Sequence, residues 1–241
     1  MMAPVMVRSI PELPEAVLFD VGDTLVPATR IAEAALTAAA EWLRKRTGDL
    51  DVKVFMDTYR EVDPQYEDPS TNHLWGLPLD IMIRACSAMG LGRSAGLTAG
   101  SVYRQEVRQG IVPDPAVVEV FRELRRRDIR VGILSNGTTI EQLDTLMLLD
   151  LIDYVDSYAI SEDHGWLKPD PRLTQVALQD LAARPERTWM VGDDPKSDGQ
   201  AARAAGMAWI RVGDGDGPGD LNISNVAELR AVMRARRAET A

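Results

Sequence analysis

The feature that most constrains the fold is a short apolar run, residues 17–19, that ends on Asp20 and passes at once into a Gly-Asp-Thr turn. A run this short, with β-branched and aromatic members, predicts a parallel strand that is buried on both faces. The carboxyl ends of the strands in an open α/β sheet form the reaction crevice. Asp20 is therefore a candidate nucleophile or metal ligand, and the alternative interpretation is an aspartate that caps the turn after the strand.

Composition limits the classes of partner. The chain has 241 residues, of which 45% are hydrophobic, enough for one large domain or for a core with an inserted module. Its formal charge of -10 argues against binding to nucleic acid or to an anionic membrane, because both require clustered lysine and arginine. The single cysteine, Cys86, lies in an apolar helical pattern that predicts a buried small side chain. We see no signal sequence and no segment long enough to cross a bilayer, and we expect a cytoplasmic protein.

Four helical patterns follow the first strand, with no strand between them. Their apolar spacing predicts helices over residues 29–46, 52–62, 77–89 and 98–109. Segments rich in Pro, Gly, Asp and Ser separate the later helices. We therefore predict a helical module, residues 27–110, inserted into an α/β core formed by residues 1–26 and 111–241.

From residue 114 onward the pattern alternates between helices and strands. Strands are predicted over 130–134, 154–160, 188–191 and 208–212, and helices over 114–127, 140–149, 171–182, 197–205 and 224–237. Together with the strand before Asp20, this alternation predicts a parallel sheet of five strands with right-handed crossovers. The acidic stretch 213–220 lacks the glutamate that ends a calcium-binding loop, so we interpret it as a surface loop.

Polar residues cluster just after the predicted strands. They are Asp20, Asp23 and Thr24 after the first strand, Ser135 and Asn136 after the second, Lys168 before a helix, and Asp193, Asp194 and Asp198 after the fourth. Because parallel strands end at one edge of the sheet, carboxylates from two of these loops can hold a hard cation such as Mg²⁺. A lysine and a hydroxyl can then balance the charge of a phosphoryl group during its transfer.

Four motifs, in this order along the chain, carry a resemblance to a known family. They are Phe-Asp-Val-Gly-Asp-Thr-Leu at 19–25, Ile-Leu-Ser-Asn-Gly at 133–137, Lys-Pro-Asp-Pro at 168–171, and Val-Gly-Asp-Asp at 191–194 with Asp198 and Ala-Ala-Gly-Met at 204–207. With these motifs the chain resembles the haloacid dehalogenase-like (HAD) hydrolase superfamily, in the class with a C1-type helical cap inserted after the first motif. The resemblance implies a Rossmann-like sheet of strand order 5-4-1-2-3, sandwiched by helices.

The same resemblance implies an activity and a role for each motif. The activity is Mg²⁺-dependent hydrolysis of a small phosphate monoester through an aspartyl-phosphate on Asp20. Ser135, Asn136 and Lys168 would bind the phosphate, and Lys168 would also neutralise Asp20. The ligands of Mg²⁺ would be Asp20, the main-chain carbonyl of Gly22 and Asp193, supported by Asp194 or Asp198.

The first motif departs from the phosphatase pattern at one position. Phosphatase members have a second aspartate two residues after the nucleophile, which protonates the leaving oxygen, whereas this chain has Gly22 there and Asp23 one residue later. Dehalogenating members also lack that aspartate and carry a Ser-Asn pair, so hydrolysis of a carbon–halogen bond is an alternative. The acids at 193, 194 and 198, which those members do not need, favour the phosphatase. A third possibility is a catalytically weakened member that binds a phosphorylated ligand, unless Asp23 replaces the missing acid.

Overall fold

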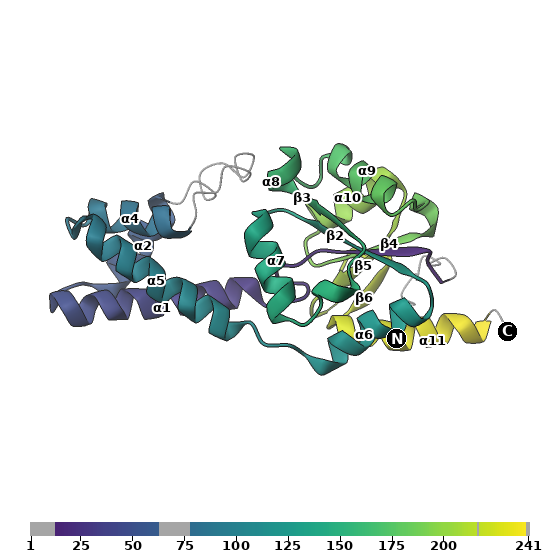
Figure 1. Ribbon diagram of the computed structural model, residues 1–241, viewed down its shortest axis with the longest axis horizontal. Helices are drawn as coiled ribbons and strands as arrows, with labels where there is room; N and C mark the ends of the chain where they lie inside the picture. The colour runs from purple at the N-terminus through teal and green to yellow at the C-terminus, as the bar shows by residue number, and fades with distance from the viewer. Residues whose placement is uncertain (1–12, 63–77, 216, 240–241) are drawn as a thin grey trace, which may run out of the picture. The chain divides into compact units, whose positions relative to one another are not determined.

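The computed structural model describes residues 13–62, 78–215 and 217–239, and the chain forms two compact units (Figure 1). The α/β unit combines Met1–Val26 with Pro113–Ala241, and the helical unit is Pro27–Val112. None of the helices in the described part of the chain is long and apolar enough to cross a membrane.

The α/β unit alternates strands and helices after its first strand. Its strands are β1 (Ala16–Phe19), β2 (Arg130–Ser135), β3 (Ser157–Ile160), β4 (Thr188–Gly192), β5 (Ala208–Val212) and β6 (Leu221–Ile223). Its α-helices are α6 (Pro115–Arg126), α7 (Thr139–Leu148), α8 (Ser161–His164), α9 (Pro171–Asp180), α10 (Asp198–Ala205) and α11 (Leu229–Glu239). Short 3-10 turns are η2 (Ile152–Tyr154), η3 (Pro185–Arg187) and η4 (Val226–Glu228).

All six strands form one parallel sheet in the order β3-β2-β1-β4-β5-β6. The predicted α/β class and the predicted order of the first five strands are confirmed. The predicted number of five strands is wrong, because β6 adds a sixth at the edge, where Leu221 pairs with Ile210 and Ile223 with Val212. Three residues with only two apolar members give too short a pattern to predict a strand.

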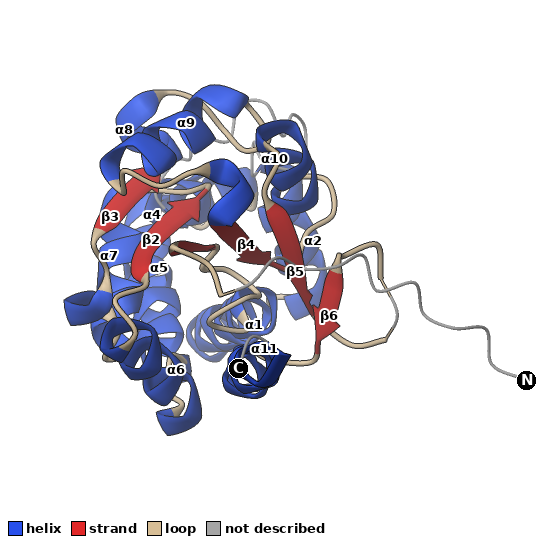
Figure 2. Cartoon of the chain, turned by 90° about the vertical axis from the view of Figure 1, so that its right-hand side faces the viewer, coloured by secondary structure: helices blue, strands red, loops and turns tan. Residues whose placement is uncertain are grey.

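Helices cover both faces of this sheet (Figure 2). Helices α9 and α10 contact strands β2 to β5 on one face, and α6 contacts β2 and α11 on the other. The ring of Phe19 in β1 stacks on that of Phe121 in α6 with centroids 4.7 Å apart, and Trp209 of β5 is buried against α10. Strand β1 therefore lies in the centre of the core, and its four side chains are fully buried.

The helical unit contains α1 (Ala28–Thr47), α2 (Val52–Val62), α4 (Pro78–Ala88) and α5 (Gly92–Gly110). Its core is apolar and includes Leu43, Phe55 and Met82 together with Cys86, whose predicted burial is confirmed. Burial raises the pKa of the Cys86 thiol to about 11. Helix α5 starts earlier than predicted, and it packs so closely on α4 that a Cβ at Gly96 would lie 2.5 Å from Ile83 Cα.

Candidate active site

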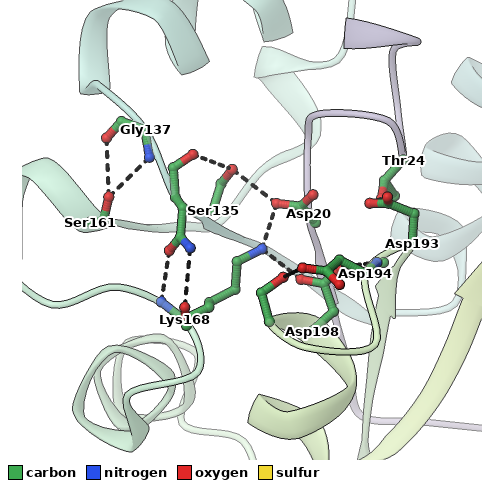
Figure 3. Close-up of polar contacts among 12 residues, drawn as sticks. Asp20, Thr24, Ser135, Gly137, Ser161, Lys168, Asp193, Asp194 and Asp198 are labelled. Carbon is green, nitrogen blue, oxygen red and sulfur yellow. Dashed lines mark hydrogen bonds and ion pairs between the residues drawn. The ribbon is translucent and has the colours of Figure 1, made fainter. Parts of the chain in front are cut away.

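The carboxyl edge of the sheet brings together side chains from four separate segments (Figure 3). Phe19 pairs with Ile133 of β2 and with Val191 of β4, so the residues that follow these three positions lie side by side. Asp20 follows β1, Ser135 ends β2, and Asp193 follows β4. Lys168 comes from the segment before α9, and Asp198 is the first residue of α10.

Asp20 is buried and receives two hydrogen bonds on the same oxygen. Its Oδ1 accepts from the hydroxyl of Ser135 at 3.0 Å and from the ammonium of Lys168 at 2.5 Å (Figure 3). A buried carboxylate is tolerated only when it is paired in this way. The two bonds fix the orientation of the carboxylate and leave its other oxygen, Oδ2, outside both of them.

Lys168 lies between two carboxylates. Its Nζ is 2.5 Å from Asp20 Oδ1 and 2.7 Å from Asp198 Oδ1, and its side chain is only 2% exposed. Burial lowers the pKa of the amine, but the charges of Asp198 and Asp20 outweigh that effect and hold the pKa above its usual value. The amine therefore remains a cation at neutral pH and can neutralise negative charge next to Asp20.

Three carboxylates can act as ligands of one metal ion. Asp20, Asp193 and Asp198 each offer an oxygen, and these oxygens lie within 4.8 Å of one another. Burial and the charge of Asp20 raise the pKa of Asp193, against a hydrogen bond from the Thr24 hydroxyl to Asp193 Oδ1 at 3.2 Å. A set of oxygen donors with excess negative charge fits a hard divalent cation.

Asp198 approaches the sheet where strand β4 ends in Gly192. A Cβ on Gly192 would lie 2.3 Å from Asp198 Oδ2, so no other residue fits here without displacing the carboxylate. Asp198 Oδ2 also accepts from the N–H of Asp194 at 3.1 Å, while its Oδ1 binds Lys168. Gly192 thus allows Asp198 to join the Lys168 ammonium to the loop that carries Asp193.

We expect Gly192→Ala to lower the free energy of unfolding by about 1–3 kcal/mol, the usual cost of overpacking a filled site. Urea denaturation measures this change. In an Asp198→Gly background the added methyl meets neither the carboxylate nor the Cβ of residue 198, so the same substitution should cost much less. If Gly192→Ala lowered the free energy of unfolding equally in both backgrounds, the close contact with residue 198 would not be the cause of the loss.

Asp23 and Asp194 are not part of this group of three carboxylates. Asp23 is exposed and has a φ of 53°, in the left-handed region. Its charge adds to the rise in the pKa of Asp193, so it lies near that residue. The carboxylate of Asp194 instead accepts from the N–H of Lys196 at 2.9 Å and from the Ser197 hydroxyl at 2.9 Å, which shapes the turn before α10.

Asn136, a predicted phosphate-binding residue, contacts the main chain of Lys168. Its carboxamide pairs with the main chain of Lys168, accepting from the N–H at 2.7 Å and donating to the carbonyl at 3.2 Å. Next to it, the hydroxyl of Ser161 bonds both polar groups of Gly137. Ser161 was not among the predicted site residues, although it directly follows the strand predicted over 154–160 and the strand-end rule used for Ser135 finds it.

Comparisons with known proteins agree with this architecture. A model of the haloacid dehalogenase-like hydrolases matches residues 14–206. A glyceraldehyde 3-phosphate phosphatase from Methanopyrus kandleri is 28% identical over 91% of this chain and 97% of its own. A ribulose-1,5-bisphosphate 5-phosphatase from Halopiger xanaduensis is 31% identical over 81% of this chain and 83% of its own.

Solved structures extend the likeness to the fold of nearly the whole chain. The crystal structure of a 2-haloacid dehalogenase from Pseudomonas syringae pv. Tomato DC3000 superposes with a TM-score of 0.66 at 24% identity, covering 91% of this chain and 98% of that one. The region that the family model matches contains every residue of the carboxylate cluster and all of the four motifs except Met207. The chain therefore belongs to the family of haloacid dehalogenase-like hydrolases.

Proposed function

We propose that the protein is a phosphatase that hydrolyses a small phosphorylated metabolite, with Asp20 as the nucleophile. The observation that carries this proposal is the surroundings of Asp20, whose Oδ1 accepts from Ser135 and Lys168 while Asp193 and Asp198 lie beside it. The site thus combines an oriented nucleophile, a buried cation and carboxylate ligands for a metal. Phosphoryl transfer requires positioning and charge neutralisation of this kind.

The proposed reaction has two steps. In the first, a carboxylate oxygen of Asp20 attacks phosphorus, an acyl-phosphate bond forms, and the bond to the leaving oxygen breaks. In the second, water attacks phosphorus, the bond to Asp20 breaks, and inorganic phosphate and the free carboxylate are released. The leaving oxygen takes up one proton and the attacking water loses one, so no net proton is taken up by the side chains.

Ser135 and Lys168 stabilise the negative charge of the phosphoryl group. Both already donate to Asp20, so each lies within reach of an oxygen bound to a phosphorus at that carboxylate. The Lys168 cation offsets negative charge as it develops in a site from which water is largely excluded, where such interactions are strongest. The hydroxyl of Ser135 orients the group by a further hydrogen bond.

Mg²⁺ fits these oxygen donors, and Asp20, the main-chain carbonyl of Gly22 and Asp193 would hold it, with Asp198 in support. When bound, the ion supplies a Lewis acid that withdraws charge from phosphoryl oxygens. Thr24 orients Asp193 for this role, since its hydroxyl donates to one oxygen of that carboxylate. Asp194 supports the loop through its bonds to Lys196 and Ser197.

The relatives support a small phosphorylated substrate. The two relatives described above are named as phosphatases of glyceraldehyde 3-phosphate and of ribulose 1,5-bisphosphate, which are both sugar phosphates. We propose that the helical unit acts as a cap that selects the substrate. The direct test is a screen of phosphorylated metabolites that starts with these two, run with Mg²⁺ and with a chelator. Release of phosphate only in the presence of Mg²⁺ supports the proposal, and no release from any ester overturns it.

We expect Asp193→Asn to weaken Mg²⁺ binding by about 10–100-fold or more, because even the outer partners of a metal site contribute this much. Isothermal titration calorimetry measures the affinity. Asp163→Asn removes an exposed charge in α8 and should leave the affinity as it is in the natural sequence. Equal affinity in the Asp193 variant and the natural sequence would remove this metal site.

One observation favours a second function. Gly22 stands where a general acid is expected, and a halide leaves without a proton, so hydrolysis of 2-haloacids is compatible with this position. The carboxylate cluster argues against it, because displacement of a halide by Asp20 does not require a metal. Halide release that persists with a chelator would favour the dehalogenase. Tight binding of a phosphorylated ligand without turnover would favour a weakened member of the family.

A further inference from the structure

We propose that Asn136 is a positioning residue whose carboxamide fixes the main chain of Lys168 and thereby holds the ammonium between Asp20 and Asp198. This inference rests on the proposed function for its kinetic consequence but not for its structural one. It differs from the direct phosphate contact that the family resemblance implies for Asn136.

The carboxamide of Asn136 matches the main chain of Lys168 at both of its ends. Oδ1 accepts from the Lys168 N–H at 2.7 Å, and Nδ2 donates to the Lys168 carbonyl at 3.2 Å. The opposite orientation of the amide would place donor against donor and acceptor against acceptor, so only one orientation satisfies both groups. The carboxamide thus makes the two main-chain hydrogen bonds that a neighbouring strand would make in a sheet.

Lys168 needs such support because it lies outside regular secondary structure. The residue follows α8 and precedes α9, and it is 95% buried, so its main-chain polar groups require partners within the protein. Asn136 supplies both partners. A long side chain with a fixed starting point has fewer positions to sample, and here its Nζ must meet two carboxylate oxygens at 2.5 and 2.7 Å.

Asn136 also couples the two groups that bind Asp20. It directly follows Ser135, whose hydroxyl donates to the same Asp20 oxygen as the Lys168 ammonium. Through the carboxamide, the loop after β2 and the segment before α9 are held at one separation. Loss of the carboxamide should therefore displace Lys168 relative to Asp20, and small displacements of a catalytic group cost about 10²-fold in rate.

The test uses the reactivity of the lysines. The sequence contains four of them, at 45, 53, 168 and 196, and Lys168 is the buried one, whereas the other three are exposed. Acetylation with an N-hydroxysuccinimide ester, followed by peptide mass spectrometry, measures all four rates in the full chain. In Asn136→Ala we expect the rate at Lys168 to rise by about tenfold or more, since two hydrogen bonds to its main chain are lost. The rates at the other lysines should not change.

Two further variants identify the cause. Ser161→Ala breaks the neighbouring contact to Gly137 in the same loop and leaves the carboxamide in place, so Lys168 should remain protected. Asn136→Asp keeps the shape and the acceptor but replaces the donor to the Lys168 carbonyl with an oxygen, so the rate at Lys168 should rise. It serves as the test if the alanine variant does not fold. The inference would be overturned if Ser161→Ala raised the acetylation rate of Lys168 as much as Asn136→Ala does. It would also be overturned if neither Asn136 variant changed that rate.

Steady-state kinetics provide the second measurement. We expect Asn136→Ala to lower kcat by about tenfold to hundredfold with a smaller change in KM, because the lysine acts on the transition state. A rise in KM with full protection of Lys168 would instead indicate direct contact of Asn136 with phosphate and would overturn the positioning role. If the natural sequence hydrolyses no phosphate ester, the proposed function fails, while the acetylation rates still decide whether Asn136 holds Lys168.

Discussion

Replacing Asp20 with asparagine is expected to lower the turnover of phosphate esters by about 10⁴-fold or more while the chain remains folded. An amide is a poor nucleophile, so the covalent step loses its attacking atom. The substitution keeps the shape of the side chain and an oxygen that can accept from Ser135 and Lys168. Lys168 also retains its bond to Asp198, so no buried cation is left without a charged partner.

Several measurements separate loss of chemistry from loss of structure. Rapid quench with a labelled substrate followed by acid precipitation measures the phosphorylated protein, which should form with the natural sequence and be absent in Asp20→Asn. Thermal unfolding by circular dichroism checks that both proteins are folded. Asp153→Asn, at an exposed aspartate in η2, is the matched control and should retain full turnover. Turnover near that of the natural sequence in Asp20→Asn would place the chemistry elsewhere.

Replacing Gly22 with aspartate is expected to raise the turnover of alkyl phosphates by about 10²–10⁴-fold, the usual contribution of a positioned general acid. The gain should be much smaller for aryl phosphates, because their leaving groups depart without a proton. Gly22 does not have a positive φ, so an aspartate there does not strain the backbone. Comparison of kcat/KM for the two classes of ester, before and after the substitution, measures this effect.

The companion variant, Asp23→Asn, should be nearly silent. Asp23 is exposed, has a φ of 53°, and is not one of the three clustered carboxylates. A large loss of alkyl phosphate turnover in this variant, together with no gain in Gly22→Asp, would instead make Asp23 the general acid. Both variants can be assayed with the same pair of substrates. A gain in Gly22→Asp with a silent Asp23→Asn, and a loss in Asp23→Asn with no gain in Gly22→Asp, cannot both be observed.

The ends of the long strands were predictable because their apolar runs stop at polar residues. That rule predicted that Asp20, Ser135 and Asp193 would lie at one edge of a parallel sheet, and the register around Phe19 brings them there. The edge strand β6 was not predictable, because it has only three residues and two of them are partly exposed. Its pairing depends on a neighbour, β5, and not on its own pattern.

Which of the carboxylates after β4 contacts Lys168 also could not be predicted. Asp194 directly follows Asp193 and Asp198 comes five residues later, so the sequence allows either of them to lie beside Asp193 in the site. The first turn of α10 and the missing side chain of Gly192 decide that Asp198 reaches Lys168. The carboxamide pairing of Asn136 with Lys168 joins residues 32 positions apart, and local sequence patterns contain no signal for such a contact.

The central place of β1 has a consequence for biosynthesis. Both of its neighbours, β2 and β4, lie after the helical unit in the sequence, so the strand leaves the ribosome long before either partner. Until then these four apolar residues, which become fully buried in the folded protein, remain in water with their main-chain groups unpaired. The intervening helices pack on one another within their own compact unit and can form first, which shortens the loop that must close before β1 pairs. A chaperone that binds short extended apolar segments would therefore find its site on this nascent chain at residues 16–19.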